Sequence, residues 1–270
     1  MDKLRAIFKW PGGKAKLLNK LCLLLPEANT FIEPFMGSGL LSLHLDYEQY
    51  LLNDSNYHLI KFFQDLIDYK KELVVLSRSL FVRENNCEIK YTEFRERFNS
   101  MGPSLLRSAI FLYLNRHGYN GLCRFNKSGK YNVPFGRYSS VYFPSRELEV
   151  FLSKSERIKL FNLDFQEFFN INIFPDNSVI YCDPPYVPLN SSSNFTTYDG
   201  NVFDFSSQKK LVSLIKSLEP RIPCLISNHY TKRTLELYKD ASITSFDVSR
   251  YISCIGNKRK KVKELLALYE

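Results

Sequence analysis

The feature that most constrains the fold is an apolar run that stops at an acid and two prolines. Residues 178–182, Ser-Val-Ile-Tyr-Cys, have the character of a buried strand, and Asp183, Pro184, Pro185 and Tyr186 follow directly. Proline lacks a backbone donor and fixes φ, so the strand must end here. Because open α/β sheets bind ligands at the carboxyl ends of their strands, the run predicts an acceptor, a rigid carbonyl and a ring at the rim of a pocket.

Such a set of groups suits an exocyclic amino group on a planar base. The Asp183 carboxylate and the Pro184 carbonyl would accept its two N–H groups, and the ring of Tyr186 would stack on the base. A plain proline-rich turn after a strand remains open on these residues alone. Other motifs have to decide between the two interpretations.

Two glycine turns and a further acid come earlier in the chain. Gly12 and Gly13 predict a tight turn after Pro11, and an amphipathic helix is expected to begin at Lys14. Residues 30–39, Thr-Phe-Ile-Glu-Pro-Phe-Met-Gly-Ser-Gly, predict a strand, a tight turn and the start of a helix. The next predicted strand ends at Asp54, a position where an acid commonly binds ribose hydroxyls. A strand predicted over 157–163 ends at Asp164 and Phe165, where an acid and a ring could hold a purine. Together with the Asp-Pro-Pro-Tyr run, these motifs form a far rarer conjunction than any one of them.

Between 57 and 143 the pattern changes to amphipathic helices followed by a long loop. The loop over 114–138 carries four glycines and four asparagines, and its aromatic residues alternate with Arg and Lys. Ser128-Gly129 predicts a hairpin within it. Tyr, Asn and Arg on such a loop can wedge into a base stack, read base edges and clamp guanine or phosphate. An ordinary polar loop would explain the glycines but not the basic–aromatic interleaving.

The composition of the chain limits the classes of binding partner, metal site and cellular location that are expected. Lys and Arg number 37 against 28 Asp and Glu, a net charge of +9 that suits a polyanionic partner. The six cysteines are scattered with no Cys-x-x-Cys pair, so neither zinc nor a disulfide framework is expected. No apolar run approaches membrane-spanning length and the N-terminus leads into no signal region, so a cytosolic protein is expected.

Taken together, these motifs resemble the Dam family of DNA adenine-N6 methyltransferases, which modify adenine in GATC. The resemblance covers nearly the whole chain and is densest at residues 8–14, 31–39, 50–54, 106–138, 179–198, 225–229 and 249–269. It implies a Rossmann-like class I S-adenosylmethionine-dependent α/β sheet with a helical insertion. The catalytic domain would comprise residues 1–56 and 144–270, and a helical target-recognition domain with a β-hairpin loop would comprise residues 57–143.

The resemblance also implies the ligands and the roles of the catalytic and cofactor residues. S-adenosylmethionine would be the cofactor and double-stranded DNA the partner, with no metal and no membrane. Asp183, Pro184 and Tyr186 would hold the adenine after it is flipped out of the helix, for direct methyl transfer to N6. The residues expected around the cofactor are Trp10, Lys14, Phe35, Gly37, Asp54, Asp164, Phe165 and Asp183.

For DNA binding, the resemblance implies separate roles for residues of the insertion and for Lys9. Tyr119 would intercalate, Asn120 would meet the orphaned thymine, and Lys9 would contact the first guanine. The other expected base readers are Leu122, Arg124 and Pro134. The expected phosphate contacts are Arg95, Asn126, Asn132 and Arg137. The enzyme would act in the cytoplasm of a bacterial or phage-infected cell, associated with the nucleoid through DNA; the oligomeric state is not predicted.

Two other functions are compatible with some of these residues, and two further loops are expected. A cytosine-N4 or an RNA or protein amine methyltransferase would share the Asp-Pro-Pro-Tyr chemistry, but the 112–138 stretch argues against it. A catalytically inactive DNA-binding protein is opposed by the intact Asp183, Tyr186 and glycine turn. The Ser-, Asn- and Thr-rich stretch over 188–202 predicts a lid, and 250–261 a basic loop.

Overall fold

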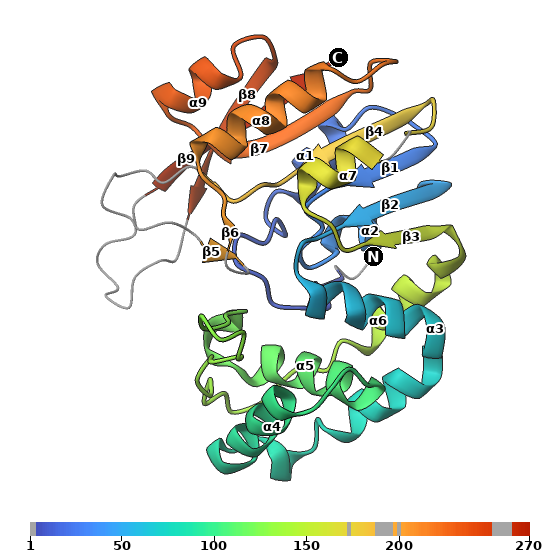
Figure 1. Ribbon diagram of the computed structural model, residues 1–270, viewed down its shortest axis with the longest axis vertical. Helices are drawn as coiled ribbons and strands as arrows, with labels where there is room; N and C mark the ends of the chain where they lie inside the picture. Colours follow the sequence, from blue (N-terminus) through green and yellow to red (C-terminus); the bar gives the residue numbers. More distant parts are fainter. Residues whose placement is uncertain (1–3, 172–173, 187–196, 199–200, 250–260) are drawn as a thin grey trace.

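A seven-stranded sheet forms the centre of the computed structural model, with the strand order β3-β2-β1-β4-β7-β9-β8 (Figure 1). The structure describes residues 4–171, 174–186, 197–198, 201–249 and 261–270. Most of the expected lid and basic loop lies outside these residues. The strands are β1 (Thr30–Glu33), β2 (Gln49–Asn53), β3 (Ile158–Phe161), β4 (Ser178–Cys182), β7 (Cys224–His229), β8 (Ser242–Ser249) and β9 (Lys261–Tyr269), and a separate pair consists of β5 (Thr197–Tyr198) and β6 (Asn201–Val202).

The connectivity of the sheet creates a switch point. Strands β3, β2, β1, β4 and β7 are parallel, whereas β9 runs antiparallel between β7 and β8. After β1 the chain adds β2 and β3 on one side, then returns to place β4 on the other. The carboxyl ends of β1 and β4 therefore mark the place where such sheets bind ligands. The predicted Rossmann-like α/β class is confirmed.

Alternation along each strand builds a core on both faces of the sheet. In β4, Val179 and Tyr181 join one buried cluster, while Ile180 and Cys182 join the other. Three helices supply the second cluster: α7 (Phe165–Ile171), α8 (Phe205–Lys216) and α9 (Lys232–Leu237). The first cluster includes residues of α1 (Leu18–Leu24), α2 (Leu40–His44) and α6 (Ser145–Ser153). Both faces are thus covered, as the near-continuous apolar strands require.

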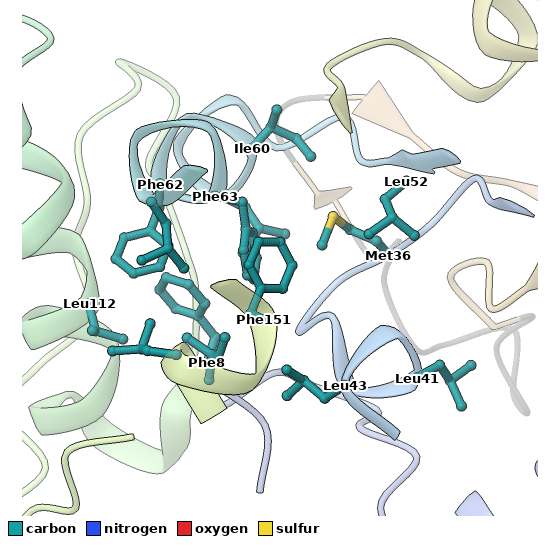
Figure 2. Packing of buried hydrophobic residues seen from close by; sticks show 14 of the residues in the cluster. Phe8, Met36, Leu41, Leu43, Leu52, Ile60, Phe62, Phe63, Leu112 and Phe151 are labelled. Atoms are coloured by element: carbon teal, nitrogen blue, oxygen red, sulfur yellow. The ribbon is translucent and has the colours of Figure 1, made fainter. Parts of the chain in front are cut away.

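The inserted helices lie beside the sheet and share its first core. They are α3 (Tyr57–Ser79), α4 (Glu88–Ser100) and α5 (Leu105–His117), with short 3-10 turns η1 (Arg83–Asn85), η2 (Tyr119–Gly121) and η3 (Ser155–Arg157) nearby (Figure 1). Phe8, from the N-terminal segment, packs between Phe62 of α3 at 4.8 Å and Phe111 of α5 at 5.2 Å between ring centroids. The ring of Phe63 lies 4.7 Å from that of Phe151 in α6, between centroids, and Figure 2 shows Phe8, Phe62, Phe63 and Phe151 together.

The loop after α5 adopts a hairpin-like form. Isolated bridges pair Gly118 with Phe135 and Phe125 with Tyr131, and the turn between the latter pair contains Gly129 at φ +70°. The chain reverses direction at the predicted position, but single bridges rather than regular strands join the two arms. Its base rests on α5, in which residues 108–117 are all buried.

Candidate active site

Asp183 stands where β4 ends, at the switch point of the sheet. Its Oδ2 lies 2.6 Å from Nζ of Lys14, and its Oδ1 accepts a 2.9 Å hydrogen bond from Oγ of Ser227. The Asp183 side chain is still 22% exposed. Since an ionised carboxylate offers about four lone-pair sites, acceptor capacity remains for an amino group that arrives from solvent.

The residues after Asp183 leave the strand, as the two prolines predict. Pro184 is buried, and Tyr186 is partly exposed. The Tyr186 ring lies 4.7 Å from Nζ of Lys14 and packs edge-on against His229 with 4.8 Å between centroids. The carboxylate, the proline backbone and the ring thus occupy one short segment at the rim of the sheet.

A cavity of about 370 Å³ lies beside this segment. Its volume falls in the range of roughly 300–1,000 Å³ that is usual for small-molecule sites. Four of the residues expected around a cofactor line it: Phe35, Asp54, Asp164 and Phe165. The other lining residues are Pro34, Asn53, Ser55, Leu163, Gln166, Pro185, Phe203 and Ser207. The structure therefore brings the expected cofactor residues of three different strand ends together.

Three rings form the apolar part of the cavity. Phe35 lies 5.7 Å from both Phe165 and Phe203, and Phe165 lies 5.4 Å from Phe203, between ring centroids. Aromatic walls of this kind suit a planar heterocycle. Phe203 was missing from the sequence interpretation. The available signal was an aromatic residue directly before Asp204, which caps α8 by accepting a hydrogen bond from Ser207 N.

The glycine turn is tied to the end of β2 through Asp54. Gly37 N donates to Asp54 Oδ2 at 2.9 Å, and Asn56 N donates to Oδ1 at 2.9 Å. Gly37 has φ +47°, and a Cβ there would lie 2.9 Å from Cδ1 of Trp10. Only glycine allows both the positive φ and this short distance to the indole, so Trp10 can lie directly against the backbone of the turn.

Lys14 does not start a helix, contrary to the sequence interpretation. Helix α1 begins at Leu18, and Leu17 at its N-cap makes no side-chain cap. The Lys14 side chain instead turns inward, donates from Nζ to the carbonyl of Gly12 at 2.8 Å and pairs with Asp183. The expected cofactor residue and the expected adenine acceptor are thus in direct contact.

Glu33, the last residue of β1, is a further acid at this site. It is 3% exposed, and no hydrogen bond reaches its Oε2. Burial raises the pKa of the Glu33 carboxyl well above its usual range, the carboxylates of Asp183 and Asp54 add to this, and Lys14 opposes it. Its sequence signal was an acid at the end of an apolar strand, directly before the glycine turn.

The hairpin-like loop forms a second surface around Lys9. Nζ of Lys9 donates to the carbonyl of Arg116 at 2.8 Å and lies 3.9 Å from the centre of the Tyr138 ring. Burial, aided by the charge of Arg116, lowers the Lys9 pKa to about 8. The main chain of Lys9 is held by Asn115, whose side chain accepts from Lys9 N and donates to Lys9 O, each at 2.8 Å.

The expected wedge residues stand next to this lysine. Tyr119 is 40% exposed, and Asn120 adopts a left-handed conformation with φ +51°. Asn120 N donates to the hydroxyl of Tyr138 at 2.9 Å. A Cβ on Gly121 would come 2.1 Å from Cβ of Lys9, so the turn packs against the lysine stem. The projecting Tyr119-Asn120 pair is therefore built on a rigid base.

The remaining expected DNA residues differ in exposure, and several of them also make hydrogen bonds or ion pairs within the protein. Arg124 is exposed, and its Nε and Nη2 donate to Oδ1 and O of Asn132 at 2.8 and 3.2 Å. Pro134 is exposed and Leu122 partly buried. Three expected phosphate contacts make internal bonds as well: Arg95 donates to the carbonyl of Val133, Asn126 accepts from Ser128 and Lys130 in the turn, and Arg137 pairs with Glu88.

In the described ranges, neither a cluster of metal ligands nor a membrane-spanning helix is present. Among these residues, no three His, Cys, Asp or Glu side chains come together as ligands for a metal ion. No helix within them has both the length and the apolar character needed to cross a bilayer.

Comparison with known proteins gives a consistent result. The family model described as D12 class N6 adenine-specific DNA methyltransferase matches residues 10–252. The chain is 44% identical over 271 residues to the DNA adenine methylase of Escherichia coli strain K12, with 100% of this chain and 97% of the relative covered. It is 43% identical to the DNA adenine methylase of Vibrio cholerae strain N16961, with the same coverage, and 41% identical to that of Serratia marcescens, with both chains fully covered.

Proposed function

The chain belongs to the family of D12 class N6 adenine-specific DNA methyltransferases, and on this premise we propose that its target is the adenine of GATC in double-stranded DNA, flipped out of the helix. The enzyme transfers a methyl group to adenine N6 in DNA with S-adenosylmethionine as cofactor. We also propose the role of each site residue, with DNA recognition in residues 57–143 and catalysis in the rest of the chain.

The cavity beside the glycine turn fits the cofactor. Three rings offer walls for its purine, and Asp54 stands at the strand end where ribose hydroxyls bind. Because Gly37 has no Cβ, the indole of Trp10 lies directly against the backbone of the turn, where it would form a further wall of the cofactor site. We assign cofactor binding to Trp10, Lys14, Phe35, Gly37, Asp54, Asp164, Phe165 and Asp183. When bound, S-adenosylmethionine supplies an electrophilic methyl group on its sulfonium.

The observation that carries the catalytic role is the acceptor geometry at Asp183. Adenine N6 is a poor nucleophile because its lone pair is delocalised into the ring. An Asp183 oxygen and the Pro184 carbonyl would accept its two N–H groups and draw that lone pair out of conjugation, while Tyr186 stacks on the base. Holding the amine in this orientation contributes to the rate by removing rotational freedom. An inactive DNA-binding protein would not need this arrangement.

Recognition is assigned to the loop surface. Arg124 keeps free N–H groups after its two bonds to Asn132, so the guanidinium edge that remains can bind guanine O6 and N7. Lys9 is assigned to the first guanine, Tyr119 to intercalation, Asn120 to the orphaned thymine, and Leu122 and Pro134 to further base contacts. Rotating the target base out of the stack costs roughly a few kcal/mol, which the inserted wedge would offset.

The phosphate contacts and the cellular location complete the proposal. Arg95, Asn126, Asn132 and Arg137 are assigned to the backbone around the hairpin, where the net charge of +9 favours DNA. In this structure Asn132 also orients Arg124, which gives it a second task. A DNA substrate supports a location in the cytoplasm of a bacterial or phage-infected cell, in association with the nucleoid.

Methylation of random-sequence DNA tests the target. The purified protein is incubated with a random duplex library and S-adenosylmethionine, and the modified bases are located by sequencing that distinguishes N6-methyladenine. The proposal expects modified adenines in GATC, with the Asp183→Ala variant as the inactive control. Modified adenines without a GATC preference would refute the target sequence and leave the family activity intact.

A further inference from the structure

We propose that Ser227 and Asn228, consecutive residues of β7, are positioning residues that hold the Asp183–Tyr186 run from the two faces of the sheet. Ser227 acts on the carboxylate of Asp183, and Asn228 acts on the carbonyl of Pro185 through Gln208. The inference rests on the proposed roles of Asp183 and Pro184 as acceptors of the adenine amino group.

The first network reaches Asp183 through Ser227. Ser227 is fully buried, and its Oγ lies 2.9 Å from Asp183 Oδ1 and 2.9 Å from the hydroxyl of Tyr181. An ionised carboxylate only accepts, so the single proton of Ser227 points to Asp183, and Tyr181 donates to Ser227. Burial raises the pKa of the Tyr181 phenol well above its usual range, which keeps this donor protonated.

The second network reaches Pro185 through a buried amide. Nε2 of Gln208, in α8, donates to the Pro185 carbonyl at 2.7 Å. Oε1 of the same amide accepts from Asn228 Nδ2 at 3.2 Å and from the hydroxyl of Tyr238 at 3.1 Å. With two donors on its oxygen, the Gln208 amide has to present its NH₂ group to Pro185. All three supporting side chains, Gln208, Asn228 and Tyr238, are at most 1% exposed.

The two networks anchor a segment that lacks backbone donors of its own at two consecutive residues. Pro184 and Pro185 have no backbone N–H, so the run loses the donors that would otherwise anchor it to neighbouring strands. Successive strand residues point to opposite faces. Tyr181 accordingly belongs to one core cluster, with Ser227 beside it, and Tyr238 belongs to the other, with Asn228 beside it. Asp183 and Pro185 are thereby held from opposite sides, and the Pro184 carbonyl between them takes a defined direction.

Single-turnover methyl transfer at saturating DNA and cofactor tests the inference. Ser227→Ala and Gln208→Met should each slow the transfer step by about 10- to 100-fold, the scale of a lost hydrogen bond to a charged or buried acceptor. The KM values for DNA and cofactor should not change. Ser178→Ala is the matched control, because this buried serine bonds the Pro175 carbonyl at the opposite end of β4. It should transfer methyl groups at the wild-type rate.

A double-mutant cycle separates positioning from general stability. Tyr181→Phe keeps the ring and removes the donor to Ser227. As a single substitution it should slow methyl transfer, but when it is combined with Ser227→Ala it should cause no further loss. Wild-type rates in Ser227→Ala, a loss seen only in KM, an equal loss in Ser178→Ala, or additive losses in the double variant would each overturn the inference. The wild type and Asp183→Ala are measured alongside. A wild type that leaves adenine unmodified would instead refute the proposed function.

Discussion

The ammonium of Lys14 lies 2.6 Å from the carboxylate of Asp183, so one ion pair joins the expected cofactor site to the expected base site. The Lys14 side chain is 8% exposed, which limits screening by solvent. Glu33 lies close enough for both charges to act on its carboxyl. Lys14 thereby offsets the repulsion among the acids that β1, β2 and β4 bring to the same edge of the sheet.

Replacing Asp183 by Ala removes one acceptor for the adenine amino group. We expect turnover to fall by about 10²–10³ or more, the range found when a preorganised polar group is deleted from an active site. The loss should persist at saturating S-adenosylmethionine, while gel-shift measurements show continued DNA binding. Near-normal turnover of the variant would remove Asp183 from the catalytic assignment.

Replacing Asp54 by Ala should weaken the binding of S-adenosylmethionine, which titration calorimetry measures. The expected change in binding free energy is about 1.5–3 kcal/mol, the scale of a lost hydrogen bond to a charged group. The anchor of Gly37 N is lost as well. Asp176→Ala, an exposed acid elsewhere on the chain, serves as the control and should bind normally. An unchanged affinity of Asp54→Ala would move the ribose contact to another residue.

Replacing Arg124 by Ala should relax sequence discrimination at one position. If Arg124 reads the guanine paired with the last cytosine of GATC, discrimination there falls by about 1–3 kcal/mol. Discrimination at the first guanine should survive, because Lys9 is assigned to it. Rates on GATC and on each single-base variant measure this. Uniform slowing on every sequence, with a shallower salt dependence, would make Arg124 a phosphate contact instead.

Discrimination at the first guanine should depend on pH. The Lys9 pKa is lowered to about 8, so in the free enzyme the ammonium is largely present at pH 7 and largely lost by pH 9. Preference for the first guanine should therefore decline over this interval. Preference at the position read by Arg124 should stay constant, since a guanidinium remains charged. The Lys9→Met variant should lack this pH dependence; a decline that persists in it would have another origin.

Stability should fall on acidification because His58 is buried in its neutral form. Its ring stacks on Phe125 at 4.8 Å, and burial together with Arg107 lowers its pKa from 6.5 to about 4. Between pH 6.5 and 4 the unfolded chain binds the extra proton, so this stability is present above 6.5 and is lost as pH falls. His58→Phe should reduce the pH slope of the unfolding free energy by up to about 1.4 kcal/mol per unit, measured by denaturant titration. An unchanged slope would contradict the buried neutral histidine.

The amino-acid sequence by itself determined the features that depend on local covalent geometry. Pro184 and Pro185 had to end the strand, which stops at Cys182, and positive φ at Gly37 favours glycine because other residues carry a Cβ. Apolar runs that end at acids were enough to place Asp54 and Asp164 at the carboxyl ends of predicted strands, and the family resemblance implied the Rossmann-like α/β class. The same local reasoning started helix α1 too early, at Lys14, because it could not foresee that this lysine turns back to an acid 169 positions later.

Tertiary structure alone decided which distant side chains meet. Ser227 reaches Asp183 because β7 lies next to β4, and that neighbour is set by chain crossovers and register rather than by spacing along the chain. Gln208 was unremarkable as a helix residue until α8 was packed under the Pro185 carbonyl. Such contacts depend on burying two cores at once. A polar residue in an apolar strand is visible in the sequence, but its partner becomes known only when the sheet has formed.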